Sequence, residues 1–594
     1  MNERLIVGLL FGSVLASLSG ACSSRGSGGG GTGGRAAGTG GGSVSGTGGN
    51  NVGTGGAATS TGGRASGTGG ESVPGSGGNS PGTGGAAAGG GGRAAGAGGT
   101  IAGTGGTIAG TGGAAGGGAR GNSVLERNNH PTRDGHFLQP TLTKARAATM
   151  ARDTTFAGTF TGNMWASPLY LENGPGGKGV FFAVTTGNDV VALDETTGTA
   201  IWPPKSIGSS PQNSGAGCGS IHPIGILSTP VIDPVTRTIY VAGAIGTASI
   251  ARHEVHALSV DDGTSRAGWP VNVSALTAGA VAFDTMPQNQ RSALSLVNGI
   301  VYVAYGGHVG DCGNYRGWVV GINAANPAMR GAWATGGVGE GIWAAGGMAS
   351  DGNGVFAMTG NSTVGTATHL DSEEVIRITG MGTLTRSNAN LYYPSTWRAM
   401  DSADADLGAV SPLVLQVPGA TPSSYVVAIA KDGHMFLLDS TNLGGMNGHV
   451  VDFRVASSGM SIHTVPASYT TAAGVHVTFS TDSGAVCPAG MPTGKVIMSV
   501  LIPAGAPPAP RVVWCAPLAG EVTSPIVTTS NGSSDAVVWY ISNGKLMGVD
   551  GDTGANIVTG ADTCSGVRRW TSPIAVKGRI IAGGDGHLCS WSAH

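Results

Sequence analysis

The sequence predicts an all-β protein, an eight-bladed β-propeller with four-stranded antiparallel blades. The first observation is a short element built around Ser-Pro, which recurs about every 50 to 65 residues. Its copies are residues 165–169, 227–231, 410–413, 464–467, 523–526 and 570–574, with two degraded copies at 291–294 and 344–347. The second observation is that short runs rich in β-branched and aromatic residues follow each copy, and the third is the scarcity of helical periodicity.

Each repeat is predicted to be one blade with a constant order of elements. The Ser-Pro element opens strand A, a polar turn such as residues 351–354 follows, and strand B comes next. Strand C ends in an acidic turn, as at Asp194 and Asp550, and strand D often ends on a tryptophan such as Trp202 or Trp514. Loops between these strands vary in length, and variable loops on a rigid scaffold are where binding functions accumulate.

The last repeat ends after its strand C, near Trp591. A complete ring needs one more strand, and a strand-like segment, Thr154–Phe160, precedes the first Ser-Pro element. We therefore expect this N-terminal strand to close the C-terminal blade, because closure removes the exposed edges of the ring.

The N-terminal fifth of the chain is predicted to lie outside the propeller. Residues 1–22 have the pattern of an export signal, and the small residues before Cys22 resemble a bacterial lipobox in which that cysteine is lipidated; the alternative is an ordinary cleaved signal. Residues 23–121 consist mainly of Gly, Thr, Ala and Ser and are expected to form a disordered tether. Residues 122–153 are a lead-in segment, and residues 154–594 are the propeller.

Six cysteines remain after Cys22, an even number in a chain expected to be exported, where disulfides persist. Six cysteines allow fifteen pairings. Proximity within the repeat favours the pairs Cys487–Cys515 and Cys564–Cys589, which leaves Cys218–Cys312. No zinc-like C-x-x-C spacing occurs.

Residues 191–202 (Val-Ala-Leu-Asp-Glu-Thr-Thr-Gly-Thr-Ala-Ile-Trp) resemble the repeat of the pyrroloquinoline-quinone (PQQ)-like β-propellers. Segments 225–233, 315–321, 341–347 and 404–408 resemble a largely uncharacterised bacterial branch, and the likeness extends from about Asn163 to Trp591. The family includes quinoprotein alcohol dehydrogenases and non-enzymatic lipoproteins, among them a component of the outer-membrane barrel-assembly machinery. The resemblance therefore implies a fold more strongly than an activity.

The chain departs from the enzymes of this family at the residues that carry their chemistry. It has no Cys-Cys pair and no haem-type C-x-x-C-H motif, and the calcium ligands and catalytic aspartate of the family find no match. We therefore expect no cofactor, with PQQ and Ca²⁺ as the alternative.

Aligning the blades on the Ser-Pro proline identifies the residues that should line one mouth of the propeller axis. The position three residues before the proline is occupied by Trp165, Leu227, Gln290, Trp343, Ala409, His463, Val522 and Trp570. Aromatic surfaces there suit a planar or apolar ligand group, although tryptophans that pack between blades would give the same pattern. With nearby charged residues, the predicted binding site comprises Trp165, Gln290, Arg291, Glu340, Trp343, His463, Glu521, Arg569 and Trp570.

A loop near the same mouth carries Asp401, Asp404 and Asp406, whose oxygens could bind Ca²⁺. The alternative is a solvated acidic loop, or carboxylates that cap backbone N–H groups.

Together these features predict a lipid-anchored, extracytoplasmic propeller that acts as a monomeric binding or scaffolding module at the bacterial outer membrane or cell surface. Its expected partners are the membrane, through the anchor, and an envelope protein or carbohydrate; the formal net charge of −2 does not favour nucleic acid. The alternatives are a PQQ- and Ca²⁺-dependent oxidoreductase acting on alcohols or sugars, and a carbohydrate-binding or hydrolytic propeller.

Overall fold

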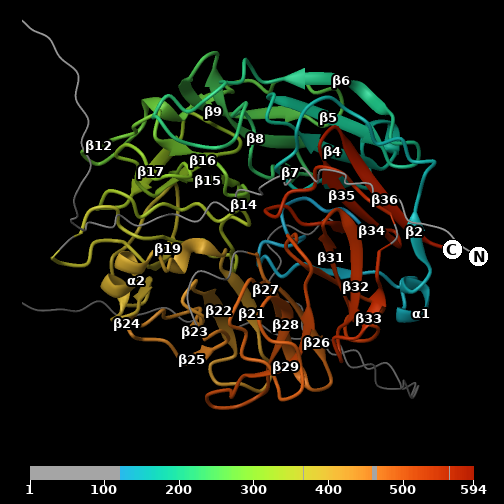
Figure 1. Ribbon diagram of the computed structural model, residues 1–594. Helices are drawn as coiled ribbons and strands as arrows, with labels where there is room; N and C mark the ends of the chain where they lie inside the picture. The colour runs from blue at the N-terminus through green and yellow to red at the C-terminus, as the bar shows by residue number, and fades with distance from the viewer. Residues whose placement is uncertain (1–120, 366, 458–463, 561) are drawn as a thin grey trace, which may run out of the picture. The chain divides into compact units, whose positions relative to one another are not determined.

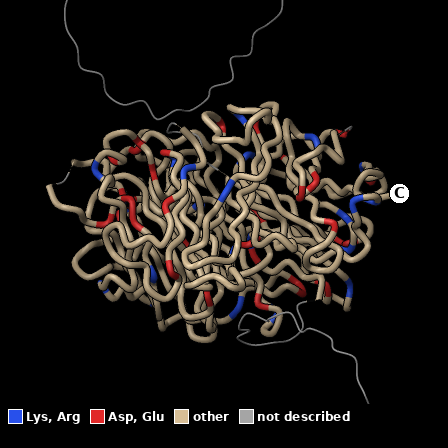
Figure 2. Tube along the Cα trace, turned by 90° about the horizontal axis from the view of Figure 1, so that it is seen from below, with Lys and Arg blue, Asp and Glu red and all other residues tan. Residues whose placement is uncertain are grey.

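The computed structural model describes residues 121–594 except 366, 458–463 and 561. The predicted signal segment, Cys22, the tether up to residue 120 and His463 lie outside the described residues. None of the helices in the described part is long and apolar enough to span a membrane. Figure 2 shows basic and acidic residues interspersed along the trace.

The described residues form eight β-sheets that follow one another in chain order around a ring, which confirms the predicted eight-bladed propeller (Figure 1). Strands β3 to β10 form the first two blades: β3 (Leu169–Leu171), β4 (Val180–Val184), β5 (Asp189–Asp194) and β6 (Ala200–Ser206) in blade 1, then β7 (Val231–Asp233), β8 (Thr238–Gly246), β9 (Ile250–Ser259) and β10 (Val271–Asn272) in blade 2. Blade 3 contains β13 (Gln288–Asn289), β14 (Ser295–Val297), β15 (Ile300–Gly307), β16 (Trp318–Asn323) and β17 (Arg330–Ala334), and blade 4 contains β18 (Val355–Met358), β19 (Val375–Ile378), β20 (Leu391–Tyr393) and β24 (Gly445–Met446).

The second half of the ring repeats this arrangement. Blade 5 contains β21 (Leu413–Gln416), β22 (Ser424–Ile429), β23 (His434–Asp439) and β25 (Val451–Arg454), and blade 6 contains β26 (Ala467–Thr471), β27 (Gly474–Thr481), β28 (Val496–Ile502) and β29 (Arg511–Pro517). Blade 7 contains β30 (Ile526–Thr529), β31 (Val537–Ser542), β32 (Lys545–Asp550), β33 (Asn556–Val558) and the added strand β1 (His136–Leu138), and blade 8 contains β34 (Ile574–Val576), β35 (Arg579–Gly584), β36 (His587–Ala593) and β2 (Met150–Arg152).

Few other elements interrupt the blades. They are the hairpin β11 (Thr277–Ala278) and β12 (Val281–Ala282), the helices α1 (Lys144–Ala147) and α2 (Trp397–Ala403), and the 3₁₀ turns η1 (Pro175–Gly177), η2 (Val273–Ala275) and η3 (Leu407–Ala409).

An N-terminal strand closes the C-terminal blade, as predicted, but it is not the predicted segment. Strand β2, Met150–Arg152, pairs antiparallel with β36, whereas Thr154–Phe160 contributes only an isolated bridge from Thr159 to His587. Asp153 accepts the backbone N–H of Thr155 in a turn, and Phe156 leaves the sheet to pack edge-on against Phe181. The segment therefore fills the boundary between blades instead of extending a sheet.

The first strand of blade 4 is reduced to a single bridge, Ala349 to Phe356, next to the degraded repeat 344–347. Gly347 there has a φ of +75°, and a Cβ at this position would lie 2.2 Å from the carbonyl oxygen of Ala293. Only glycine adopts this conformation at such a close approach without strain. At Gly346, which takes the place of the proline in this copy, a Cβ would lie 2.5 Å from Oγ of Ser411 and 2.6 Å from Cγ2 of Val465, so a larger residue would require these side chains to move.

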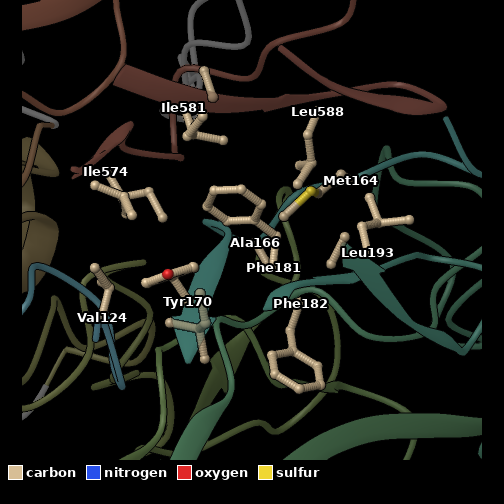
Figure 3. Packing of buried hydrophobic residues seen from close by; sticks show 14 of the residues in the cluster. Val124, Met164, Ala166, Tyr170, Phe181, Phe182, Leu193, Ile574, Ile581 and Leu588 are labelled. Atoms are coloured by element: carbon tan, nitrogen blue, oxygen red, sulfur yellow. The ribbon is translucent and has the colours of Figure 1, made fainter. Parts of the chain in front are cut away.

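Apolar side chains pack between neighbouring blades. Figure 3 shows part of the largest cluster, in which Phe181 of blade 1 faces Ile574, Ile581 and Leu588 of blade 8, while Phe182 points to the other side of its strand. The two ends of the ring thus share a core, and burial of these side chains stabilises closure alongside the β2–β36 pairing.

The lead-in segment forms a plug across the axis, because residues 124–139 hydrogen-bond to residues in or next to the first strand of every blade. Val124 pairs with Tyr170 of blade 1, and the carbonyl of Leu125 accepts the N–H of Ile232 of blade 2. The remaining bonds are Arg133 to Leu294 (blade 3), Pro131 to Ser350 (blade 4), Thr132 to Val414 (blade 5), Asp134 to Ser468 (blade 6), Gly135 to Val527 (blade 7) and Gln139 to Gly578 (blade 8).

These contacts fall at or near one repeated position, two residues after the Ser-Pro proline, so the plug crosses the axis below the mouth. The chain enters the plug from the opposite end of strand A, where Asn122 donates two hydrogen bonds to Glu172 in the turn after β3. The axial mouth is therefore closed from beneath.

Candidate functional site

Two tryptophans and one arginine meet at the mouth. Trp343 and Trp570 begin blades 4 and 8, on opposite sides of the ring, yet their ring centroids lie 6.3 Å apart at 87°. The guanidinium carbon of Arg291, from blade 3, lies 5.1 Å from the centroid of Trp343 and 4.7 Å from that of Trp570. Cation–π attraction holds such a charge against both indoles.

Two further cations extend this group into a row. The ammonium of Lys431 lies 5.4 Å from the Trp343 ring, and the guanidinium carbon of Arg569 lies 4.9 Å from the Trp570 ring. The order across the mouth is Lys431, Trp343, Arg291, Trp570 and Arg569, which we call the axial row. Cations and aromatic rings alternate along it, so each cation is stabilised by at least one indole face.

The central arginine of the axial row has no carboxylate partner among the described residues. Arg291 is 7% exposed, and its one hydrogen bond there runs from Nε to the carbonyl oxygen of Trp343, at 3.1 Å. Burial, together with the charge of Arg569, lowers the pKa of Arg291 to about 10. The guanidinium remains charged at neutral pH, and its terminal N–H groups are available to an anionic group.

Beside Arg291 lies a small hollow. Its lining combines apolar, amide and imidazole groups and consists of Gly219, Ser220, Ile221, Ile224, Leu227, Asn289, Arg291, His308 and Val309. The buried Oδ1 of Asn289 has no hydrogen-bond partner among the described residues. Burial lowers the pKa of His308 to about 4, so its imidazole is neutral at pH 7.

A disulfide and a tryptophan fix the walls of the hollow. The Cys218–Cys312 disulfide joins the loops that carry Gly219 and Val309, and all three pairings favoured by the sequence are present. Trp165 packs behind the hollow, against the cluster of Ile221, Ile224, Leu227, Ala244 and Ile250. A rigid wall lowers the entropic cost of binding.

Other residues of the predicted site are placed differently. The guanidinium carbon of Arg568 lies 5.4 Å from the ring centroid of Trp165, whereas Trp570 packs edge-on against Trp343. Gln290 is buried and donates to the carbonyl of Ser292. Glu521 has an exposed side chain, 3.7 Å from Arg569, and His463 is not described. The predicted ring therefore contributes Arg291, Trp343, Trp570 and Arg569 to the axial row.

Glu340 does not join the axial row but belongs to a buried acidic group. It is fully buried and accepts the N–H of Gly337 at 2.7 Å; burial and the nearby charge of Asp371 raise its pKa to about 7. Glu373 and Glu374 are also buried, and burial raises the pKa of both well above the usual range. These side chains favour the protonated form at moderately acidic pH.

The three aspartates proposed for calcium are engaged by protein donors. Lys431 lies 2.9 Å from Asp404 and 2.5 Å from Asp406, in ion pairs that are largely buried. Asp401, on α2, accepts the backbone N–H of Ser362 at 2.9 Å and the hydroxyl of Ser372 at 3.0 Å. The ammonium occupies the position next to Asp404 and Asp406 that a cation would need.

Within the described residues, one set of three side chains brings metal-ligand atoms within 4.8 Å of one another: Cys564, His587 and Cys589. The two cysteines form a disulfide, so their sulfur atoms are not thiolate ligands.

The fold and site define a closed eight-bladed propeller with a cationic, aromatic mouth. No protein-family model and no curated protein matches the chain. Similar solved structures include a quinohemoprotein alcohol dehydrogenase from Pseudomonas putida HK5, with 13% identity over 80% of each chain and a TM-score of 0.57.

Two other similar structures are a quinohemoprotein alcohol dehydrogenase from Comamonas testosteroni (14% identity, 80% of this chain and 81% of that one, TM-score 0.53) and a europium-containing methanol dehydrogenase (14%, 78% and 90%, 0.53). At this identity the likeness shows the fold alone. The predicted resemblance to PQQ-like β-propellers is thus confirmed for the architecture.

The residues present do not fit a quinone cofactor with a calcium ion. Trp343 and Trp570 pack edge to face with ring centroids 6.3 Å apart and the Arg291 guanidinium lies against both, so they do not present two parallel faces between which a planar ring system would stack. Asp404 and Asp406 are both ion-paired with Lys431, whose ammonium lies where a calcium ion would bind.

Sequence reasoning missed Asn289, His308 and Lys431. Lys431 follows β22 and gives no local signal of its partners on the loop after α2, about 25 residues earlier in the chain. Asn289 and His308 are adjacent only because β13 pairs with the end of β15, with Asn289 opposite Gly306. The only sequence signal for Asn289 was its place directly before Gln290, a residue that the blade alignment put at the mouth.

Proposed function

We propose that this chain is an extracytoplasmic binding protein that holds a small organic anion in the hollow beside Arg291. The observation that carries the proposal is the buried Arg291 guanidinium, which lacks a carboxylate partner among the described residues and borders a hollow that also contains the unpaired Oδ1 of Asn289. A charged donor and a bare acceptor side by side call for a ligand with complementary groups.

The lining specifies the chemistry of the ligand. A carboxylate would accept hydrogen bonds from the terminal nitrogens of Arg291, and a hydroxyl or amine would donate to Asn289. A short apolar segment would contact Ile221 and Leu227. Hydroxy acids, including sugar acids, combine these three features in a small molecule.

The path of the chain supports an orientation for this mouth. Residue 122 lies at the turn after β3, at the end of strand A opposite the axial row. If residues 23–121 tether the propeller to a lipid on Cys22, the hollow faces away from the attachment point. Three disulfides support an oxidising, extracytoplasmic location, and we propose the bacterial outer membrane or cell surface, with an envelope carbohydrate or protein as the ligand source.

Calorimetric titration with lactate, gluconate, acetate and glucose tests the binding function. We expect the two hydroxy acids to bind more tightly than acetate, and glucose to be inactive. Arg291→Gln should weaken the hydroxy acids at least tenfold, because a charge-assisted pair contributes about 1.5–3 kcal/mol. Asn289→Ala should weaken the binding of the hydroxy acids until their affinities approach that of acetate. Arg330→Gln, at a position far along blade 3, serves as the matched control.

Equal affinities in the wild type and Arg291→Gln, or preferential binding of glucose, would disprove the proposal. The oxidoreductase alternative is tested on the same protein: saturable binding of PQQ with Ca²⁺, together with dye-linked oxidation of an alcohol or sugar, would replace a binding function with an enzymatic one. For the anchor, radiolabelled palmitate should be incorporated by the wild type and not by Cys22→Ala.

A further inference from the structure

Arg127, in the plug, is a buried cation surrounded by neutral groups. Arg127 is 1% exposed to solvent. Nε donates to Oδ1 of the neighbouring Asn128 at 2.9 Å, and Nη2 donates to the hydroxyl of Ser524, on the inner strand side of blade 7, at 3.3 Å. Nη1 donates to no group in the described part of the chain.

The charges nearby do not neutralise Arg127. The charged group that perturbs it is Arg133, and burial first, with this like charge second, lowers the pKa of Arg127 to about 9. Arg133 itself pairs with Glu126 at 3.2 Å, with both side chains buried. One positive charge in the plug therefore lacks a counter-charge among the described residues, an arrangement that is costly in a low-dielectric interior.

Hydroxyl groups surround this level of the axis. The position one residue before the Ser-Pro proline carries a buried hydroxyl in six blades: Ser167, Thr229, Ser292, Ser411, Ser524 and Ser572. Lateral hydrogen bonds join neighbouring copies, as from the N–H of Ser167 to the hydroxyl of Thr229. The hydroxyl of Ser411 has no hydrogen-bond partner among the described residues.

We propose that a small monovalent anion, of the size and charge of chloride, binds to the Arg127 guanidinium on the propeller axis. The anion would accept from Nη1 and from hydroxyls of this ring, and it would neutralise the unpaired charge. The residue's 1% exposure restricts the site to an ion without a bulky body. This site is distinct from the hollow beside Arg291, which lies at the level of the axial row.

The anion has a structural consequence for ring closure. Next to Arg127, Asn128 donates to the carbonyl of Pro466 in blade 6, and its Oδ1 lies 3.5 Å from the hydroxyl of Ser572 in blade 8. Arg127 itself reaches blade 7 through Ser524. An anion that stabilises Arg127 in the plug thereby stabilises the contacts of the plug with the last three blades.

Thermal unfolding in a chloride titration tests the proposal, with sodium isethionate, a bulky sulfonate, keeping the ionic strength constant. An ion that binds only the folded state should leave the midpoint unchanged well below its Kd and raise it logarithmically above the Kd, by about 1 °C per tenfold increase in chloride for a domain of this size. Bromide should replace chloride. Arg330→Gln, on β17 of blade 3 and outside both anion sites, should keep the whole chloride dependence.

Arg127→Met should unfold at a midpoint that is independent of chloride. Because that variant could fail to fold, crystals of the wild type grown in sodium bromide supply a second measurement, in which an anomalous peak should lie within hydrogen-bonding distance of the Arg127 guanidinium. A wild-type midpoint that does not respond to chloride, or a bromide map without a peak at Arg127, would overturn the proposal. Loss of ligand binding at Arg291 alone would leave it standing.

Discussion

Protonation of Glu340 should make the stability of the propeller depend on pH in a predictable direction. The carboxyl has a folded pKa of about 7 against an ordinary value of 4.5, because it is fully buried and lies near Asp371 and Asp401. A carboxyl whose folded pKa is raised contributes stability below its unfolded pKa, and this contribution is lost as pH rises through the folded pKa. Between pH 5 and pH 8 the loss amounts to about 2.5 kcal/mol.

Glu340→Gln removes this titration while its amide oxygen can still accept the N–H of Gly337. The free energy of unfolding, measured with urea at pH 5 and pH 8, should therefore show the variant gaining about 2.5 kcal/mol on the wild type at the higher pH. Glu373 titrates in both proteins and cancels in the comparison, whereas the pKa of Glu374, which the charge of Glu340 helps to raise, falls in the variant. Glu521→Gln, on an exposed side chain, should show no such gain. A difference between variant and wild type that is the same at both pH values would refute the reasoning.

Three further substitutions probe the buried network and the closure of the ring. Lys431→Met should lower the free energy of unfolding by about 3–5 kcal/mol, because it leaves the carboxylate of Asp406 buried without a cation; adding Asp406→Asn should recover part of this loss, as a double-mutant cycle would measure. Arg133→Met should lower the free energy of unfolding at pH 7 by a similar amount. It should also increase the rate of proteolysis in the plug, because it removes hydrogen bonds to blades 3 and 4. Replacing both Cys564 and Cys589 with serine should cost about 3 kcal/mol in urea unfolding, and unchanged stability would mean that the denatured chain gains no freedom from losing the bond.

The architecture could be predicted from the sequence because each blade repeats the same local chemistry. A Ser-Pro element, two-residue alternation and an acidic turn are local signals, and they recur often enough to count blades even where one copy is degraded to Ala-Ala-Gly-Gly. The same repeat placed Cys487 near Cys515 and Cys564 near Cys589. The closing strand was displaced by a few residues, because the choice between Met150–Arg152 and Thr154–Phe160 depends on packing against another blade.

The candidate site was only partly accessible to the same reasoning. Alignment of the blades placed Trp343, Trp570 and Arg291, the residue after Gln290, at one level of the axis. It implied, however, that only residues of consecutive blades are neighbours. Large side chains reach across a narrow axis, so Trp343 meets Trp570 from the opposite side of the ring. The sequence also did not show which charged residues form ion pairs, such as Lys431 with Asp406.

The sequence by itself determined the all-β class, the number of blades, the cysteine pairs that repeat spacing favours and the level of the axis that Trp343 and Trp570 share. The tertiary structure decided that the lead-in segment plugs the axis, that Arg291 lies against both Trp343 and Trp570, and that Arg127 is buried without a counter-charge among the described residues. The physical reason is that periodicity and turn chemistry are encoded within each repeat, whereas contacts on the axis join eight separate segments, and their energies depend on burial and charge that arise only once the ring is closed.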